Sequence, residues 1–391
     1  MEARVVGGRA ALLVWSALVA CDSALARSPM SDPAREPSVP AVPAIANTPA
    51  PEAPAEALEI APPQATAPSD VDTSPDAARV VLVTVDGVRW EDVFAGVAAN
   101  SLAEPTGGEM MMPHLHRLVR DRGIALGGPG CEHDVRASGP SFVSLPGYLE
   151  IFTGKPTTCT HNGCPGVDVP TVIDEARAIA SSESDVAVFA SWGRYALAVA
   201  RDRKAIVVSA GASTNSLGPK DDAKLRAYAE AGARSAGYPG HGDYRPDVHT
   251  AQIALRYLET KRPHLLVVGL GDADEYAHRG DHAGYRRALR RTDEFIADLD
   301  RTLERMGEDG RETAVLVTTD HGRAHSFRGH GASFPESQRV FVAAFGAGVA
   351  RRGATCTSSP LRLAHVAGAV RTLLGLEGEA GPLAAELVGP N

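Results

Sequence analysis

Carboxylates and imidazoles with the spacing of metal ligands occur in three parts of this 391-residue chain. Asp86 and the pair Asp320-His321 each follow a continuous apolar run. Asp274 stands four residues before His278, a step that puts both side chains on one face of a helix. Carboxylate and imidazole ligands together suit zinc, with manganese or iron as alternatives. These residue types therefore predict a divalent-metal site.

His330, in the glycine-bearing stretch "FRGHG", is a further candidate ligand. Asp272 is an alternative to Asp274, but it lacks the four-residue step to His278. Taken singly, each candidate has an ordinary structural explanation as a helix N-cap, a turn residue or a loop histidine. Their joint occurrence after buried strands favours the metal site.

The segment 138–154, "SGPSFVSLPGYLEIFTG", contains the candidate nucleophile. Ser144 precedes Leu-Pro and a predicted helix, so its hydroxyl lies where free N–H groups and the positive end of the helix dipole favour an alkoxide or a phosphoryl group. A simple N-cap serine explains the local pattern equally well. On chemistry alone, Ser138 and Ser141 compete for the same role.

Buried strands must position these groups. Continuous apolar runs begin at Arg79, His264 and Thr313, and each ends in acidic residues. Amphipathic helices are predicted over 246–260 and 285–306. Further strand candidates are "DVAVFAS", "AIVVSAG" and "RVFVAAFG". This alternation predicts an α/β fold with a doubly wound, mainly parallel central sheet flanked by helices. Carboxylates gathered at the carboxyl ends of its strands repel one another unless a cation lies among them.

Four motifs, in this order, resemble the alkaline phosphatase superfamily, and most closely its type I phosphodiesterase/nucleotide pyrophosphatase branch. They are "VVLVTVDGVRWEDVF", "VSLPGYLEIFTG", "DADEYAHRGD" and "VTTDHGRAHSFRGHG". In that branch a Thr or Ser followed by x-Pro, and then by a helix ending in Thr-Gly, carries the nucleophile. Ser144, Pro146 and Thr153-Gly154 match this spacing, whereas Ser138 and Ser141 do not.

The resemblance implies an alkaline phosphatase-like catalytic domain with two divalent metal ions, zinc above all and manganese as the alternative. The implied ligands are Asp274, His278 and His330 for one ion, and Asp86, Asp320, His321 and the Ser144 oxygen for the other. The implied activity is the hydrolysis of phosphoric mono- or diesters through a phosphoseryl intermediate, with the two ions about 4 Å apart and bridged by the substrate. The partner is then a small phosphorylated molecule.

Departures from the family pattern narrow this expectation. Gly147-Tyr148 stand where the phosphodiesterases often carry Asn-His, which puts nucleotide specificity in doubt. Tyr148 also replaces the arginine of the sulfatase motif C/S-x-P-x-R, which argues against sulfatase chemistry. Arg323 and Arg328 could contact the phosphate or could be solvated loop charges. The alternatives are a phosphotransferase, a phosphonate-active or phosphoglycerate mutase-like member of the superfamily, and a non-catalytic exported binding lipoprotein.

The first 77 residues predict export. Residues 1–26 combine early arginines with a short apolar run, as secretory signals do. "LVAC" resembles the bacterial lipobox and makes Cys21 the candidate lipid-anchored residue, with cleavage after Ala26 as the alternative. Residues 27–77 are rich in Pro and Ala and predict a disordered tether. Residues 78–391 would be the catalytic domain of a periplasmic or cell-surface bacterial lipoprotein.

Charge and cysteine usage agree with this placement. The formal net charge of -9 disfavours nucleic-acid binding, because a polyphosphate backbone repels such a surface. An even number of cysteines beyond Cys21 predicts two disulfides in an oxidising compartment. The expected pairs are Cys159 with Cys164 and Cys131 with Cys356, and a cysteine-rich zinc site is the alternative.

Overall fold

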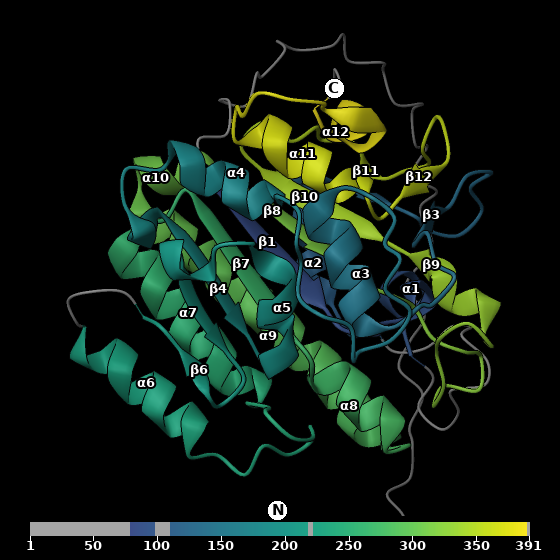
Figure 1. Ribbon diagram of the computed structural model, residues 1–391. Helices are drawn as coiled ribbons and strands as arrows, with labels where there is room; N and C mark the ends of the chain where they lie inside the picture. The colour runs from purple at the N-terminus through teal and green to yellow at the C-terminus, as the bar shows by residue number, and fades with distance from the viewer. Residues whose placement is uncertain (1–78, 98–109, 218–221, 389–391) are drawn as a thin grey trace, which may run out of the picture. The chain divides into compact units, whose positions relative to one another are not determined.

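The computed structural model describes residues 79–97, 110–217 and 222–388, and Figure 1 shows the arrangement of their helices and strands. The predicted signal peptide, Cys21 and the predicted tether over residues 27–77 lie outside the described residues. None of the helices in the described ranges has both the length and the apolar character needed to cross a bilayer.

The largest sheet within the described residues has nine strands in the order β11-β2-β10-β8-β1-β7-β4-β5-β6. Its strands are β1 (Arg79–Val85), β2 (Gly123–Leu126), β4 (Val186–Ala190), β5 (Val207–Ala210), β6 (Thr214–Asn215), β7 (Leu265–Leu270), β8 (Thr313–Thr318), β10 (Val342–Gly346) and β11 (Gly353–Ala354). The central strands β8, β1, β7, β4 and β5 run parallel, and β10 and β6 pair antiparallel to their neighbours. The prediction of a mainly parallel sheet is confirmed.

Helices cover both faces of this sheet, as Figure 1 shows. They are α1 (Trp90–Phe94), α2 (Pro113–Arg122), α3 (Ser144–Thr153), α4 (Val172–Ile179), α5 (Ala196–Val199), α6 (Ala223–Ala233), α7 (Asp247–Lys261), α8 (Asp272–His278), α9 (His282–Met306), α10 (Glu308–Arg311), α11 (His365–Leu373) and α12 (Gly381–Leu387). Along β1, Val80 and Leu82 belong to the buried cluster that includes residues of α3, α4, α5, α11 and α12, whereas Val81 and Val83 belong to the cluster on the other face, with residues of α2, α7 and α9. A strand buried on both faces is apolar at nearly every position, which explains the near-continuous apolar runs of the sequence.

The predicted elements differ from the observed ones mainly at their ends. The helix predicted over 285–306 begins earlier, at His282, because the Asp281 side chain accepts a hydrogen bond from the Gly284 N–H and caps the helix. The strand predicted for "RVFVAAFG" is present but is divided at Phe341. Its first residues form β9 (Arg339–Val340) in a small sheet with β3 (Val135–Arg136) and β12 (Leu361–Arg362), and the rest forms β10. At Phe341, between them, the carbonyl accepts a hydrogen bond from the Thr318 hydroxyl.

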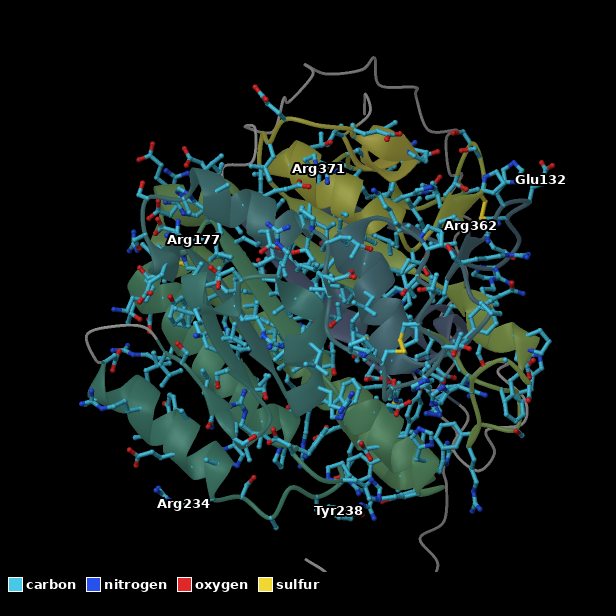
Figure 2. The ribbon with its side chains drawn as sticks, in the orientation of Figure 1. Glu132, Arg177, Arg234, Tyr238, Arg362 and Arg371 are labelled. Carbon is cyan, nitrogen blue, oxygen red and sulfur yellow. A yellow bond between two sulfur atoms is a disulfide. The ribbon has the colours of Figure 1, made fainter. Side chains whose placement is uncertain are left out.

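Both predicted disulfides are confirmed. Cys131 pairs with Cys356, with 5.2 Å between their Cα atoms, and Cys159 pairs with Cys164, with 5.9 Å between theirs. Figure 2 draws the sulfur–sulfur bond of the first pair near the labelled Glu132 and that of the second beside α3. These four cysteines are therefore engaged in disulfides, and the zinc site that the sequence left open for them is ruled out.

The two disulfides are expected to differ in their effect on stability. They close loops of 225 and 5 residues, and the loop-entropy relation then assigns them about 5 and about 2 kcal/mol of the free energy of unfolding. Urea unfolding of a Cys131→Ser/Cys356→Ser variant and of a Cys159→Ser/Cys164→Ser variant measures the difference. Equal losses in the two variants would contradict the expectation.

Candidate metal centre and nucleophile

Apart from Ser144 on α3 and His330 in a loop, the predicted metal ligands follow the carboxyl ends of three adjacent strands. β1 lies between β7 and β8 and runs parallel to both, with Val85 in register with Leu270 and Thr84 with Thr318. Asp86 directly follows β1, Asp320 lies two residues beyond β8, and α8 begins two residues beyond β7. Parallel strands in register deliver the residues that follow them to one edge of the sheet, which is where open α/β sheets bind ligands.

One group of ligand atoms comes from Asp86, Asp320 and His321, and these atoms all lie within 4.8 Å of one another. The His321 Nε2 atom is 3.5 Å from Asp86 Oδ1 and 3.5 Å from Asp320 Oδ2. The Ser144 hydroxyl lies 3.2 Å from Asp86 Oδ1 and 3.5 Å from His321 Nε2. The structure thus brings together the four residues that the resemblance assigns to one metal ion.

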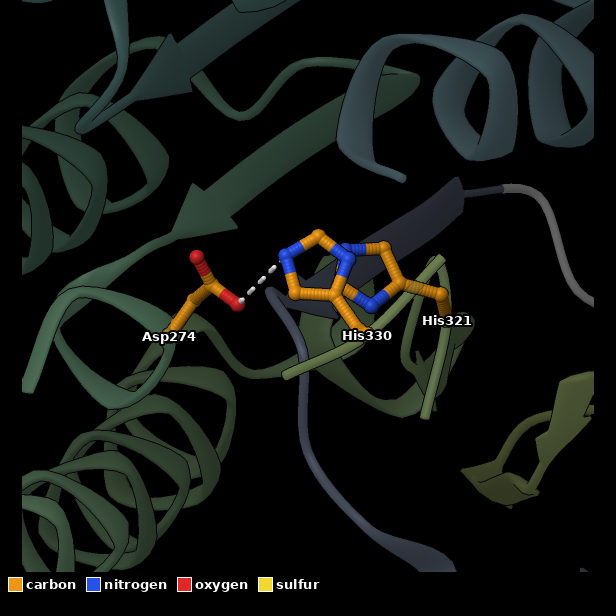
Figure 3. A group of neighbouring side chains, drawn as sticks. All are labelled: Asp274, His321 and His330. Atoms are coloured by element: carbon orange, nitrogen blue, oxygen red, sulfur yellow. Dashed lines mark ion pairs between the residues drawn. The ribbon is translucent and has the colours of Figure 1, made fainter. Parts of the chain in front are cut away.

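A second group of ligand atoms comes from Asp274, His330 and His321, again within 4.8 Å of one another (Figure 3). The rings of His321 and His330 are stacked, with centroids 4.0 Å apart. His278, which the resemblance assigns to this ion, lies beside the group: its Nε2 atom is 3.0 Å from Asp274 Oδ2 and 2.9 Å from His330 Nε2. His321 therefore belongs to both groups, so the two candidate sites are adjacent.

The two central imidazoles point their Nε2 atoms toward the carboxylates because their Nδ1 atoms have backbone partners. His321 Nδ1 lies 2.8 Å from the Gly322 carbonyl oxygen, and His330 Nδ1 lies 2.8 Å from the Phe142 carbonyl oxygen. A carbonyl oxygen can only accept, so each Nδ1 carries the proton and each Nε2 keeps its lone pair. Metal-binding histidines are oriented by contacts of this kind.

A divalent cation fits this cluster on electrostatic grounds. Asp320 Oδ2 is buried and has no hydrogen-bond partner within the described ranges. Burial, together with the charges of Asp320 and Asp274, raises the pKa of Asp86 well above its usual range, and burial does the same to the pKa of Asp320. Burial also lowers the pKa of His321, which favours the neutral ring. A divalent cation supplies the positive charge that stabilises buried carboxylates in their ionised form, and its imidazole ligands are neutral.

The Asp272–Asp274 alternative is decided by where each carboxylate points. Asp272 Oδ1 accepts hydrogen bonds from the Tyr244 hydroxyl, at 2.8 Å, and from the Asp247 N–H at the start of α7, at 3.2 Å. Asp274 instead faces the histidines of the second group. Asp272 is therefore a structural residue between two helices, and Asp274 stays the candidate ligand.

The two candidate substrate arginines have different surroundings. Arg323 is not solvated, as one reading of the sequence had it, because its guanidinium is buried and forms an ion pair with Asp274 Oδ1. Although burial alone raises the pKa of Asp274, Arg323 and the neighbouring histidines hold that pKa well below its usual range. Arg328 is exposed and lies beside Gly280.

Ser144 is the first residue of α3, and Val143 rather than Ser144 is the N-cap. Its hydroxyl is therefore not used in capping and is directed at Asp86 and His321. The competing hydroxyl of Ser138 donates a hydrogen bond to Glu150 Oε1 at 2.6 Å, within α3. Gly154 ends this helix in the left-handed region, at φ 70°, which accounts for the Thr-Gly of the motif.

Sequence reasoning missed two side chains next to the nucleophile. The Asn162 side chain accepts a hydrogen bond from the Leu145 N–H through Oδ1, at 2.9 Å. Asn162 belongs to the loop that the Cys159–Cys164 disulfide closes, and that tight loop was the signal in the sequence that could have marked it. Tyr148, treated only as a departure from family motifs, donates a hydrogen bond to Asp86 Oδ2 at 2.8 Å.

Comparison with known proteins agrees with this geometry. Residues 242–378 match the family model described as "Metalloenzyme superfamily". No match was found among curated protein sequences.

Solved structures with a similar fold include a putative sulfatase from Bacteroides thetaiotaomicron, with a TM-score of 0.55, 12% identity and coverage of 81% of this chain and 75% of that chain. The phosphonate monoester hydrolase of Agrobacterium radiobacter has a TM-score of 0.51 and 14% identity, with coverage of 80% of this chain and 78% of that chain. A protein of the alkaline phosphatase superfamily from Vibrio parahaemolyticus has a TM-score of 0.50 and 11% identity, with coverage of 79% of this chain and 69% of that chain.

The segment matched by the family model carries the candidate ligands Asp274, His278, Asp320, His321 and His330. Residues 242–378 are therefore similar to the Metalloenzyme superfamily, and the fold of the chain is similar to that of a solved member of the alkaline phosphatase superfamily.

Proposed function

We propose that this protein hydrolyses phosphoric esters through a phosphoseryl intermediate on Ser144, with two divalent metal ions held by the seven candidate ligands. The observation that carries the proposal is the position of the Ser144 hydroxyl, 3.2 Å from Asp86 Oδ1 and 3.5 Å from His321 Nε2 at the first residue of a helix. When bound, divalent ions at such a site lower the pKa of a hydroxyl and neutralise charge on a phosphoryl group. Zinc fits the mixed carboxylate and imidazole set best, with manganese as the alternative.

The proposed reaction has two chemical steps. The Ser144 oxygen forms a bond to phosphorus while the bond from phosphorus to the departing alcohol oxygen breaks, and the alcohol leaves. Water then attacks the phosphoseryl group, which restores the serine hydroxyl and releases the phosphate. Throughout, the phosphoryl group lies at the N-terminus of α3, where the positive end of the helix dipole favours negative charge. The N–H groups of Leu145 and Gly147 already have acceptors, Asn162 Oδ1 and the Val143 carbonyl oxygen.

Tyr148 favours phosphoesters over sulfate esters as substrates. Formylglycine sulfatases need an arginine four residues after the modified Cys or Ser, and Tyr148 stands at that position. Its hydroxyl is bonded to Asp86. The spacing of Ser144, Pro146 and Thr153-Gly154 supports placing the protein near the type I phosphodiesterase branch, although Gly147-Tyr148 departs from that branch.

Direct assay tests the proposal. The purified chain, loaded with zinc or with manganese, is given an aryl phosphate monoester, a diaryl phosphate diester, an aryl phosphonate monoester and an aryl sulfate of the same leaving group. Turnover of the monoester or the diester above that of the sulfate supports it. Turnover of the sulfate alone, or of none of the four with both ions bound, would defeat it and in the latter case favour a non-catalytic binding protein.

The proposed setting is the periplasm or cell surface of a bacterium, with a lipid on Cys21 and residues 27–77 as a tether to the membrane. The lipobox-like "LVAC" and the Pro/Ala composition support it. Cys21→Ala is expected to move the protein from the membrane fraction to the soluble fraction, because a lipidated cysteine is the only anchor proposed. Immunoblotting of fractionated cells measures this, and an unchanged distribution would argue against the anchor and leave simple secretion.

A further inference from the structure

Asp86 divides its two carboxylate oxygens between different partners. Oδ1 lies 3.2 Å from the Ser144 hydroxyl and 3.5 Å from His321 Nε2. Oδ2 accepts the hydrogen bond of the Tyr148 hydroxyl at 2.8 Å. Asp86 and Tyr148 are only 5% and 1% exposed, so bulk water cannot take the place of the tyrosine. The tyrosine thus engages one oxygen and leaves the other to the nucleophile and the histidine.

Tyr148 and Ser144 reach Asp86 from the same face of α3, because they are four residues apart on a helix. Gly147 lets this first turn come close to the strand ends. A Cβ atom at Gly147 would lie 2.5 Å from the carbonyl oxygen of Asp320 and 2.9 Å from its Cβ. Gly147 and Tyr148 therefore let the first turn of α3 pack directly against the candidate ligands Asp320 and Asp86.

A second tyrosine holds the ring of Tyr148 in place. The ring centroids of Tyr148 and Tyr195 are 4.3 Å apart, and the Tyr195 hydroxyl is hydrogen-bonded to Thr84 Oγ1 at 2.9 Å. Gly269 on β7 makes room for the ring of Tyr195, because a Cβ atom at Gly269 would lie 2.6 Å from the Tyr195 Cε2 atom. Thr84 lies on β1 and Asp86 directly follows that strand, so the two tyrosine hydroxyls bond to residues two positions apart. Only Tyr148 bonds to a candidate ligand.

We propose that Tyr148 is a positioning residue, whose hydroxyl holds Asp86 so that Oδ1 is available to the metal ion of the Asp86–Asp320–His321 group. Without the hydroxyl, the carboxylate can turn about its last side-chain bond, and Oδ2 loses its buried donor. Loss of an outer partner of a metal ligand typically lowers metal affinity or activity roughly 10–100-fold. This inference rests on the proposed metal sites, and only its kinetic readout rests on the proposed function.

The test compares Tyr148→Phe with the matched control Tyr195→Phe in the full chain. Each variant removes one buried hydroxyl and keeps both rings of the pair. Zinc affinity is measured by competition with a chromophoric chelator, and circular dichroism of the metal-free proteins checks the fold. For Tyr148→Phe, the affinity for one of the two ions is expected to fall about 10–100-fold, and kcat to fall while KM changes little. Tyr195→Phe is expected to bind both ions as the wild type does.

Two results would overturn the proposal: wild-type zinc affinity in Tyr148→Phe, or equal weakening in both variants, which would show a general loosening of the fold. If the wild type binds two ions without hydrolysing phosphoesters while Tyr148→Phe loses one of them, the positioning role stands and the proposed function falls.

Discussion

Replacing Ser144 with alanine is expected to lower phosphoester turnover by about 10³-fold or more, as is typical when a nucleophile is removed. The Ser144 hydroxyl is directed at Asp86 and His321 and caps no helix, so its loss should leave the fold intact. Both metal ions should remain bound, because the carboxylates and imidazoles of both groups are unchanged. Single-turnover kinetics and elemental analysis of the variant measure the two effects.

Ser141→Ala is the matched control for this experiment, because Ser141 lies three residues before Ser144 and outside the helix. It should keep near-normal turnover. Ser138→Ala should also cost far less activity than Ser144→Ala, although it removes the hydrogen bond to Glu150. Labelled phosphate trapped at low pH is expected on Ser144. If Ser144→Ala retains near-normal activity, water attacks the phosphorus directly, and the phosphoseryl mechanism is wrong while a metal-dependent hydrolase remains possible.

Asp320→Asn is expected to remove one of two bound metal ions and to lower turnover roughly 10³-fold or more, because a metal ion supplies several kcal/mol of transition-state stabilisation. The asparagine oxygen can still accept the hydrogen bond that the Gly87 N–H donates to Asp320 Oδ1 at 3.1 Å. An amide group replaces Oδ2, the oxygen that has no hydrogen-bond partner among the described residues. Since burial raises the pKa of Asp320, ionising it in the folded chain is unfavourable. The metal-free variant should therefore be at least as stable at neutral pH as the metal-free wild type.

Asp272→Asn is the matched control, because Asp272 is as buried as Asp320 and also uses one oxygen, Oδ1, to accept its hydrogen bonds. It should retain both ions. Elemental analysis and thermal melting with and without zinc compare the two variants. Two ions in Asp320→Asn, or one in Asp272→Asn, would mean that the ligands have been assigned to the wrong carboxylates.

The strands that carry the candidate site could be recognised from the sequence alone. A strand buried on both faces is apolar at nearly every position, so β1, β7 and β8 appear as near-continuous apolar runs, and the acidic residues that follow them mark the carboxyl edge. The Asp274–His278 pair was also readable, because a four-residue step places two side chains on one helical face. Local spacing carries this information, since each of these relations lies within a few residues of chain.

The tertiary structure decided how the side chains use their polar atoms. Ser144 and His321 are 177 residues apart, and Arg323 meets Asp274 across 49 residues, so no local pattern could report either contact. The same holds for Tyr148, which is bonded to Asp86 from another element. The sequence favoured Asp274 over Asp272 by its step to His278, but only the tertiary structure shows that Asp272 accepts a hydrogen bond from the start of α7 while Asp274 faces the histidines. A carboxylate takes the direction in which buried donors or cations lie, and segments distant in the sequence supply those groups.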